Sequence, residues 1–378
     1  MDPTEREEFT REFSQCVECL GPRGYESEVV NYIKNELKRI ADEIIIEPNF
    51  GNLYAKMNGN DPNAPSVMLV THIDINGFEV INATDDGLVE FRALGDVDPG
   101  TLLSKPVTIH TKRGTTPGVL TFRPTGLRSV QDVGKGVTYE DLCIDIGASS
   151  REEVTDIGVQ PGDPVTLYWP KQRLITIGDG KSVSGQGIDS RMQVFGIVKA
   201  MQIIKKEGGV DSTIWFSAET QGETLYLSSH YATLDRIRPD IALVCEAGFV
   251  QPLMDVHLVT TRTGGGPIFR TAMGIMSDTG GFIMRRRILD LMEETARECK
   301  VPYQVSVWGA DQPGEMFNWV CVTPGWGPEG IPTAHIRFPL RYKHHASEVQ
   351  YIEDYENALK VIVAFLRKIH AGIDLGSK

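Results

Sequence analysis

The sequence lacks the features that would place a protein in a membrane or outside the cell. No apolar run approaches the roughly 18 residues that a membrane-spanning helix needs. The first residues, MDPTEREEF, are too acidic for a secretory signal. Six cysteines in a chain of 378 residues do not suggest a disulfide framework, and they suit a reducing compartment. We therefore expect a cytoplasmic protein.

The sequence also has fewer basic than acidic residues. The 38 Lys and Arg residues are outnumbered by 51 Asp and Glu residues, and the formal net charge of -13 comes from no single acidic tail. An acidic surface of this kind repels phosphate backbones and anionic lipids. The charge therefore argues against nucleic acid and membranes as partners, and we expect a small-molecule substrate instead.

The pattern of apolar residues changes twice along the chain. At both ends of the sequence, predicted strands alternate with helices, which indicates an α/β sheet covered by helices on both faces. In the middle, short alternating runs such as VTIHTK and DPVTLYW are separated by Gly, Pro and Asp, which indicates a small β-barrel or sandwich. We predict an α/β catalytic domain formed by residues 1–76 and 179–378, interrupted by an all-β domain at residues 77–178.

Polar side chains follow several of the predicted strands. Ligands of an open α/β sheet bind beyond the carboxyl ends of its strands, and ionised groups there are costly to desolvate without partners. Any one of these residues, taken alone, is explained by a structural role as a helix cap, a solvated charge at a strand end or a buried histidine. Together they form a His, Asp and Glu set that suits a divalent transition metal. The residues are His72, Asp74, Asp189, Glu219, Glu246, His344 and His345.

Five segments also match known motifs in their order along the chain. These are HIDINGF, DLCIDIGASSREEVTDIGVQPGDPV, GIDSR, GAD with Asp311, and RYKHHASEV. They resemble the metallo-aminopeptidase family that includes glutamyl and deblocking aminopeptidases and the tetrahedral TET particles. The resemblance covers nearly the whole chain. It implies a zinc-peptidase-like mixed sheet, an inserted barrel-like domain that shapes the pocket and mediates oligomerisation, and a homo-oligomer.

The resemblance implies a role for each residue of the first metal site. His72 and Glu246 would bind the first metal, with Glu246 at a position where the family usually has Asp, and Asp189 would bridge two metals. Asp74 would orient the site, as a carboxylate near a metal-bound imidazole can do. Glu219 would be the general base that takes a proton from the attacking water.

The second metal site departs from the family pattern. The family has a carboxylate directly after the catalytic Glu, where this sequence has Thr220. Without it only Asp189 and His344 remain, fewer than the roughly three protein ligands of catalytic sites, so we expect one divalent metal per subunit. Manganese or zinc suits the ligand set, as do iron and cobalt. The alternative is that Thr220 or nearby Glu223 serves as the ligand, and His344, Thr220 and Asp311 are candidates for second-site or substrate contacts.

Other departures surround the expected substrate pocket. Where the family has Glu after the HxD motif, this sequence has Ile75, and where the family then has Ile, this sequence has Asn76. The segment FRPTGL lacks a histidine that is usual in the inserted domain. In the family the second metal helps to hold the free amino terminus of a peptide, so its loss argues against aminopeptidase activity. We therefore expect hydrolysis of another carbon–nitrogen bond by a metal-activated water. The resemblance extends to an aminohydrolase of aromatic compound degradation, so the main prediction is deamination of 5-nitroanthranilate to 5-nitrosalicylate and ammonia.

Two alternatives stay open. An active two-metal aminopeptidase would release N-terminal residues from short peptides and would hold two metals per chain. A non-catalytic binding or assembly protein with a decayed peptidase fold is the other. It is disfavoured because His72, Asp74, Asp189 and Glu219 would have little reason to persist together at strand ends.

Overall fold

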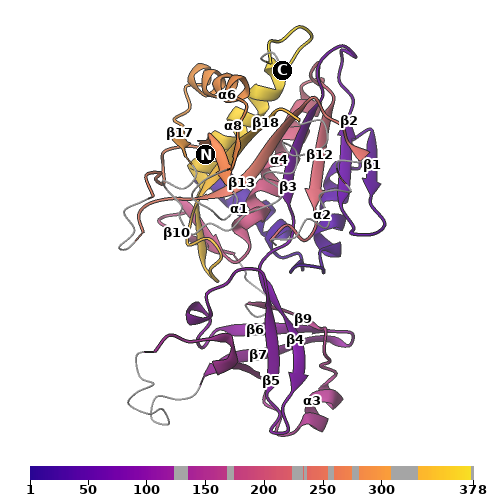
Figure 1. Ribbon diagram of the computed structural model, residues 1–378, viewed down its shortest axis with the longest axis vertical. Coiled ribbons are helices and arrows are strands. Elements are labelled where there is room, and N and C mark those ends of the chain that lie inside the picture. The colour runs from indigo at the N-terminus through magenta and orange to yellow at the C-terminus, as the bar shows by residue number, and fades with distance from the viewer. Residues whose placement is uncertain are drawn as a thin grey trace.

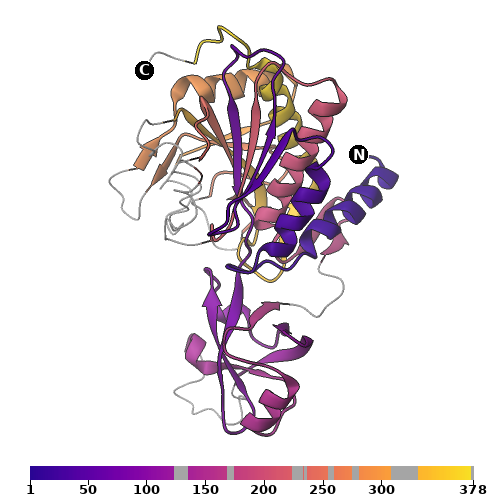
Figure 2. The same cartoon turned by 90° about the vertical axis from the view of Figure 1, so that its right-hand side faces the viewer.

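The computed structural model consists of an α/β part and a smaller β-barrel at one end of its long axis (Figure 1). The N-terminal helix α1 (Pro3–Val17) and the C-terminal helix α8 (Ile352–Lys368) both belong to the α/β part, and the side view shows the barrel beneath it (Figure 2). In the part of the chain that the structure describes, no helix is long and apolar enough to cross a membrane. The described residues are 1–122, 135–167, 174–223, 233, 236–253, 259–274, 281–307 and 331–375.

In the residues that the structure describes, eleven strands form a mixed sheet at the centre of the α/β part. Strand β3 (Val67–His72) lies between β12 (Ile214–Glu219) and β13 (Ile241–Phe249) and runs parallel to both. Strand β18 (Thr333–Arg341) continues the parallel arrangement beside β13. These central strands are buried along nearly their whole length, which explains their continuous apolar sequences. The other strands of this sheet are β1 (Glu43–Ile46), β2 (Leu53–Met57), β10 (Leu174–Ile177), β11 (Ser182–Gly185), β14 (Ile268–Arg270), β17 (Gln304–Ser306) and β19 (Glu348–Tyr351).

The principal hydrophobic core lies between this sheet and its helices. Aromatic side chains from four elements meet there, with Phe13, Phe195, Phe338 and Tyr355 all buried. Helix α4 is apolar around most of its circumference, and it therefore lies inside the core. Strands β15 (Ala272–Gly274) and β16 (Gly281–Ile283) form a separate pair. The helices are α1 (Pro3–Val17), α2 (Ser27–Leu37), α4 (Ile188–Lys206), α6 (Arg286–Glu298) and α8 (Ile352–Lys368).

The described strands of the smaller part number six and form a closed barrel in the order β4-β5-β8-β7-β6-β9. Closure leaves no unpaired edge, and the barrel encloses its own core around Phe78, Ile109 and Val165. The predicted fold class, a mixed α/β fold with a separate barrel, is confirmed, whereas the boundaries at residues 77 and 178 stay predictions. The barrel elements are β4 (Gly77–Ala83), β5 (Val89–Leu94), β6 (Pro106–Thr111), β7 (Gly114–Phe122), β8 (Leu142–Asp145) and β9 (Pro164–Leu167), with α3 (Arg151–Ile157) and the short 3-10 helices η1 (Pro99–Thr101) and η3 (Tyr139–Asp141).

The two parts of the molecule meet beside several of the predicted site residues. The connection from the end of β3 to the start of β4 is short and consists of residues 73–76. A small cavity lies at this junction, with Val97 and Leu167 of the barrel on one side and Asp189 and His344 of the α/β part on the other. The barrel therefore closes one side of the sheet edge where the predicted site residues lie.

Candidate metal centre

Parallel strands bring three of the predicted residues to one edge of the sheet. His72 is the last residue of β3, and it is in register with Glu219, the last residue of β12. Glu246 lies within β13 on the other side of β3. Asp189 lies in the first turn of α4, where its backbone is not yet helical. Because the carboxyl ends of parallel strands meet at one edge, these groups converge.

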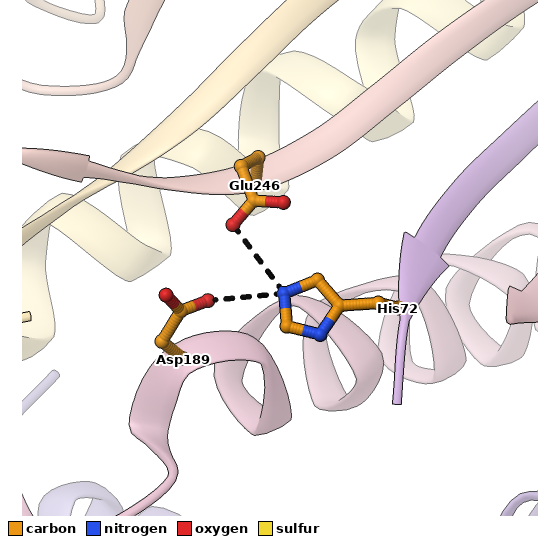
Figure 3. A group of neighbouring side chains, drawn as sticks. All are labelled: His72, Asp189 and Glu246. Carbon is orange, nitrogen blue, oxygen red and sulfur yellow. Dashed lines mark ion pairs between the residues drawn. The ribbon is translucent and has the colours of Figure 1, made fainter. Parts of the chain in front are cut away.

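His72, Asp189 and Glu246 form a first group of potential ligands (Figure 3). The Nε2 atom of His72 lies 3.4 Å from Asp189 Oδ1 and 3.5 Å from Glu246 Oε1. Ligand atoms about 2.1 Å from a shared tetrahedral ion would be about 3.4 Å apart, so the spacing suits one ion between them. The structure thus brings together the three residues that we predict for the first metal.

A second group contains Asp189, Glu223 and His344. His344 Nε2 lies 3.5 Å from Glu223 Oε2 and 3.7 Å from Asp189 Oδ2. The two oxygens of Asp189 therefore point to different groups, as those of a bridging carboxylate would. Glu223, which the sequence admits only as an alternative, is the third potential ligand of this group. The expectation of a single metal assumed that this third ligand was missing.

Thr220 points away from both groups. Its backbone N–H donates to Asn52 Oδ1 over 2.9 Å, and its hydroxyl lies 2.9 Å from the same oxygen and 3.0 Å from the carbonyl oxygen of Phe50. The side chain is 1% exposed. Thr220 therefore helps to fasten the turn after β12 and belongs to neither group.

Asp74 connects the two groups through that turn. Its carboxylate accepts hydrogen bonds from the backbone N–H groups of Gly222 and Glu223, at 2.6 and 3.0 Å. The same carboxylate lies 3.4 Å from His72 Nδ1, which is also 3.1 Å from the Asp74 carbonyl oxygen. Asp74 therefore orients both the His72 ring and the backbone that carries Glu223.

The potential ligand atoms fit a divalent cation. Among the described residues, His72 Nε2, Asp189 Oδ1, Glu223 Oε1 and His344 Nε2 have no hydrogen-bond partner, and Asp189 Oδ2 has the ion pair with the Lys343 ammonium. Buried polar atoms without such a partner are costly, and a bound cation would supply the missing interaction. Imidazole nitrogens with carboxylate oxygens suit manganese, iron, cobalt or zinc.

In the metal-free centre, burial and neighbouring charges shift the pKa values of several side chains. Burial raises the pKa of Glu223 well above its usual value. Burial lowers the pKa of His72, but the Glu246 and Glu223 carboxylates outweigh it, and the pKa rises well above its usual value. Burial, followed by the charge of Lys343, lowers the pKa of His344 to about 4. Since ligands must be deprotonated, metal binding here would release protons.

Two residues of the RYKHHASEV motif belong to this centre but have no role in the sequence prediction. Lys343 Nζ lies 3.1 Å from Asp189 Oδ2 and 3.5 Å from Glu246 Oε1. Glu348 accepts hydrogen bonds from the backbone N–H groups of Asp189 and His344, at 3.1 and 2.9 Å. Burial, and then the charge of Asp189, raises the pKa of Glu348 to about 8. Their place beside the histidines in one motif is the signal that could have found them.

The remaining predicted residues have different positions. His345 belongs to neither group, because its Nδ1 atom lies 3.1 Å from the carbonyl oxygens of Tyr342 and Lys343. Glu219 is buried, and its Oε1 accepts a hydrogen bond of 3.0 Å from Ser217 Oγ. Asp311 and residues 123–127 of FRPTGL lie outside the described residues.

Ile75 and Asn76, the two departures after HxD, lie where the α/β part meets the barrel. Ile75 packs against Gly187, which has φ 75°, and a Cβ added to Gly187 would lie 2.7 Å from the Ile75 side chain. Asn76 lines the junction cavity, and its carbonyl oxygen accepts a hydrogen bond of 2.8 Å from Gln186 Nε2. Asn76 therefore forms part of the cavity wall, and Ile75 packs against Gly187, which also lines the cavity.

The family profile described as M42 glutamyl aminopeptidase matches residues 51–361. The chain belongs to this family. It is similar to the lysyl aminopeptidase of Pyrococcus furiosus, with 25% identity over 94% of this chain and 96% of the relative. The TET aminopeptidase structure from a marine sediment Thaumarchaeota archaeon has a TM-score of 0.85 and 26% identity, covering 96% of this chain and 97% of that one.

A further structure concerns assembly. The TET1 peptidase of Pyrococcus horikoshii, which is described as able to assemble into a tetrahedron or a large octahedral shell, has a TM-score of 0.76 and 23% identity. The match covers 96% of this chain and 100% of that one. This likeness supports the shared fold.

The predicted deamination of an aromatic amine is wrong. The family profile and the relatives point to an aminopeptidase, which was the alternative, and the protein is a hydrolase of the metallo-aminopeptidase type. The prediction depended on Thr220 leaving the second metal with too few protein ligands. The structure brings Glu223 to that place, so this reason for a changed substrate disappears.

Proposed function

We propose that the protein is a two-metal aminopeptidase that releases N-terminal residues from short peptides. The observation that carries the proposal is the pair of ligand groups that share Asp189, in a chain of the M42 family. His72, Asp189 and Glu246 would hold one ion, and Asp189, Glu223 and His344 the other. Bound divalent ions would acidify a water, polarise the peptide carbonyl and hold the free amino terminus.

Glu219 is the proposed general base. Its position beside His72 on the neighbouring parallel strand places its carboxylate at the same edge of the sheet. The hydrogen bond from Ser217 Oγ holds one carboxylate oxygen of Glu219 in place. Glu219 would take a proton from the attacking water and return it to the leaving amino group, a contribution of about a hundredfold to ten-thousandfold.

The barrel, residues 77–178 in the predicted division, would limit the substrate. Val97 and Leu167 extend from it to the junction cavity, where they would contact the side chains of a bound peptide. A homo-oligomer, with the barrel contributing to assembly as well as to the pocket, is part of the same proposal. So is the cytoplasmic location expected from the sequence.

The test is an assay of the metal-stripped protein after addition of Mn²⁺ or Zn²⁺. Short peptides with a free amino terminus are compared with the same peptides acetylated at that terminus. We expect release of the first residue only from the free peptides, because the amino group must reach the ions. Equal cleavage of both series, or of neither with any metal, would contradict the proposal.

A further inference from the structure

A buried ammonium group lies inside the acidic metal centre. Lys343 Nζ is 3.1 Å from Asp189 Oδ2 and 3.5 Å from Glu246 Oε1, and its side chain is 5% exposed. Both carboxylates are fully buried. A charge removed from water in this way requires partners of opposite sign, and the two carboxylates provide them.

The oxygens that Lys343 contacts are themselves potential metal ligands. Glu246 Oε1 is the atom that lies 3.5 Å from His72 Nε2 in the first group. Asp189 Oδ2 is the atom that lies 3.7 Å from His344 Nε2 in the second group. A divalent ion bound by these atoms would therefore share its ligands with an ammonium group.

The position of Lys343 is held from outside the acidic groups as well. Its Nζ lies 5.8 Å from the ring centroid of Phe249, at the end of β13. The backbone on either side of it is constrained, with positive φ at Tyr342 (58°) and His344 (66°). The Phe249 ring is therefore a contact of the ammonium in addition to the two carboxylates.

We propose that Lys343 is an internal counterion that competes with the metal for Asp189 and Glu246 and so weakens the affinity of the first group. This inference rests on the metal binding of the proposed function. In the metal-free protein the ammonium neutralises the buried carboxylates and keeps the site assembled. An arriving ion has to displace these contacts and then bind within a few ångströms of a like charge.

The competition should favour one group over the other. Glu246 belongs to the first group alone, whereas Glu223 belongs to the second. Lys343 contacts the ligand carboxylate of the first group together with the shared Asp189. The effect of Lys343 on metal affinity should therefore be smaller without Glu246 and should persist in full without Glu223.

The experiment compares Lys343→Met, which removes the charge, with Lys343→Arg, which keeps it. Mn²⁺ binding to the metal-stripped proteins is measured by isothermal titration calorimetry, with circular dichroism as the check of folding. We expect Lys343→Met to bind the first-group ion about tenfold or more tightly, since a like charge at this distance is removed. Lys343→Arg should stay within about threefold of the unmodified protein, because its charge is retained.

The assignment to the first group is tested in two backgrounds. In Glu223→Gln, which impairs the second group, Lys343→Met should still tighten Mn²⁺ binding about tenfold. In Glu246→Gln the same change should tighten Mn²⁺ binding less than in Glu223→Gln, because the contact with Glu246 is gone while the contact with Asp189 and the like charge remain. An equal effect in both backgrounds overturns the assignment.

Unchanged or weaker Mn²⁺ affinity in a folded Lys343→Met protein overturns the proposal. If this variant does not fold without metal, Lys343→Gln replaces it with the same expected result, because its amide can still donate to the carboxylates. The readout is separate from peptide hydrolysis. Tighter Mn²⁺ binding without any peptidase activity would leave the inference standing and contradict the proposed function. Normal peptidase activity with unchanged Mn²⁺ affinity would contradict the inference and leave the proposed function standing.

Discussion

Glu223 Oε2 lies 3.5 Å from His344 Nε2, although the family pattern places the second-site acid directly after Glu219. The carboxylate reaches this place from a later position in the chain because Asp74 binds the backbone N–H groups of Gly222 and Glu223. A ligand group can thus be kept while the residue that supplies its acid changes.

Substitution of Glu223 should abolish the second ion. We expect Glu223→Gln to lower the metal content, measured by plasma mass spectrometry, from two ions per chain to one. The loss of one ion should reduce kcat/KM for short peptides by about a hundredfold. Thr220→Ser is the matched control and should keep both ions, since its hydroxyl can still reach Asn52. Two ions in Glu223→Gln would show that Glu223 is not a ligand.

Substitution of Glu219 should separate catalysis from metal binding. Glu219→Gln should lower kcat by about a hundredfold to ten-thousandfold, because the amide does not take a proton, while the metal content stays the same. Ser217→Ala should cause a smaller loss of kcat, since it removes a hydrogen bond to the Glu219 carboxylate and leaves the carboxylate itself in place. Near-full activity of Glu219→Gln would exclude its role as the base.

Asp74 should act through the ligands that it orients. We expect Asp74→Asn to weaken metal binding by about tenfold to a hundredfold, as do other changes to partners of metal ligands. Calorimetric titration of the stripped protein with Mn²⁺ measures this effect. Asp85→Asn is a suitable control because the Asp85 side chain is 94% exposed in the barrel. Unchanged affinity in Asp74→Asn would mean that His72 and Glu223 are held by other contacts.

The stability of the metal-free protein should fall as the pH rises from about 5 to 8 in part because of Glu26. Burial, and then the charge of Asp74, raises the pKa of Glu26 to about 7. A carboxyl with a raised pKa in the folded state contributes its stability fully below its unfolded pKa and loses it as the pH passes the folded value. Thermal unfolding of the unmodified protein should therefore show a lower Tm at pH 8 than at pH 5.

The matched variant is Glu26→Gln, whose side-chain oxygen can still accept from the N–H groups of Gly24 and Gln221. Its Tm should fall less over the same pH range, because the amide does not ionise. An identical fall in both proteins would show that Glu26 does not titrate in this range.

The sequence by itself determined the central strands and the residues at their ends. Continuous apolar runs predict β3, β12 and β13, and the acidic and histidine side chains that follow these runs, His72, Glu219 and Glu246, are expected at one edge of a parallel sheet. This reasoning works because a buried strand is recognised from local composition. The side chains at its end then have few possible directions.

Only the tertiary structure decided which acid completes the second group and where Lys343 lies. The direction of the turn after β12 depends on Asn52 and Asp74, which are 168 and 148 residues away in the chain from the groups that they bind. Local composition carries no information about such distant hydrogen bonds. Thr220 therefore suggested a missing metal and a changed substrate. The folded chain instead brings Glu223 to the second ligand group and the Lys343 ammonium to the first.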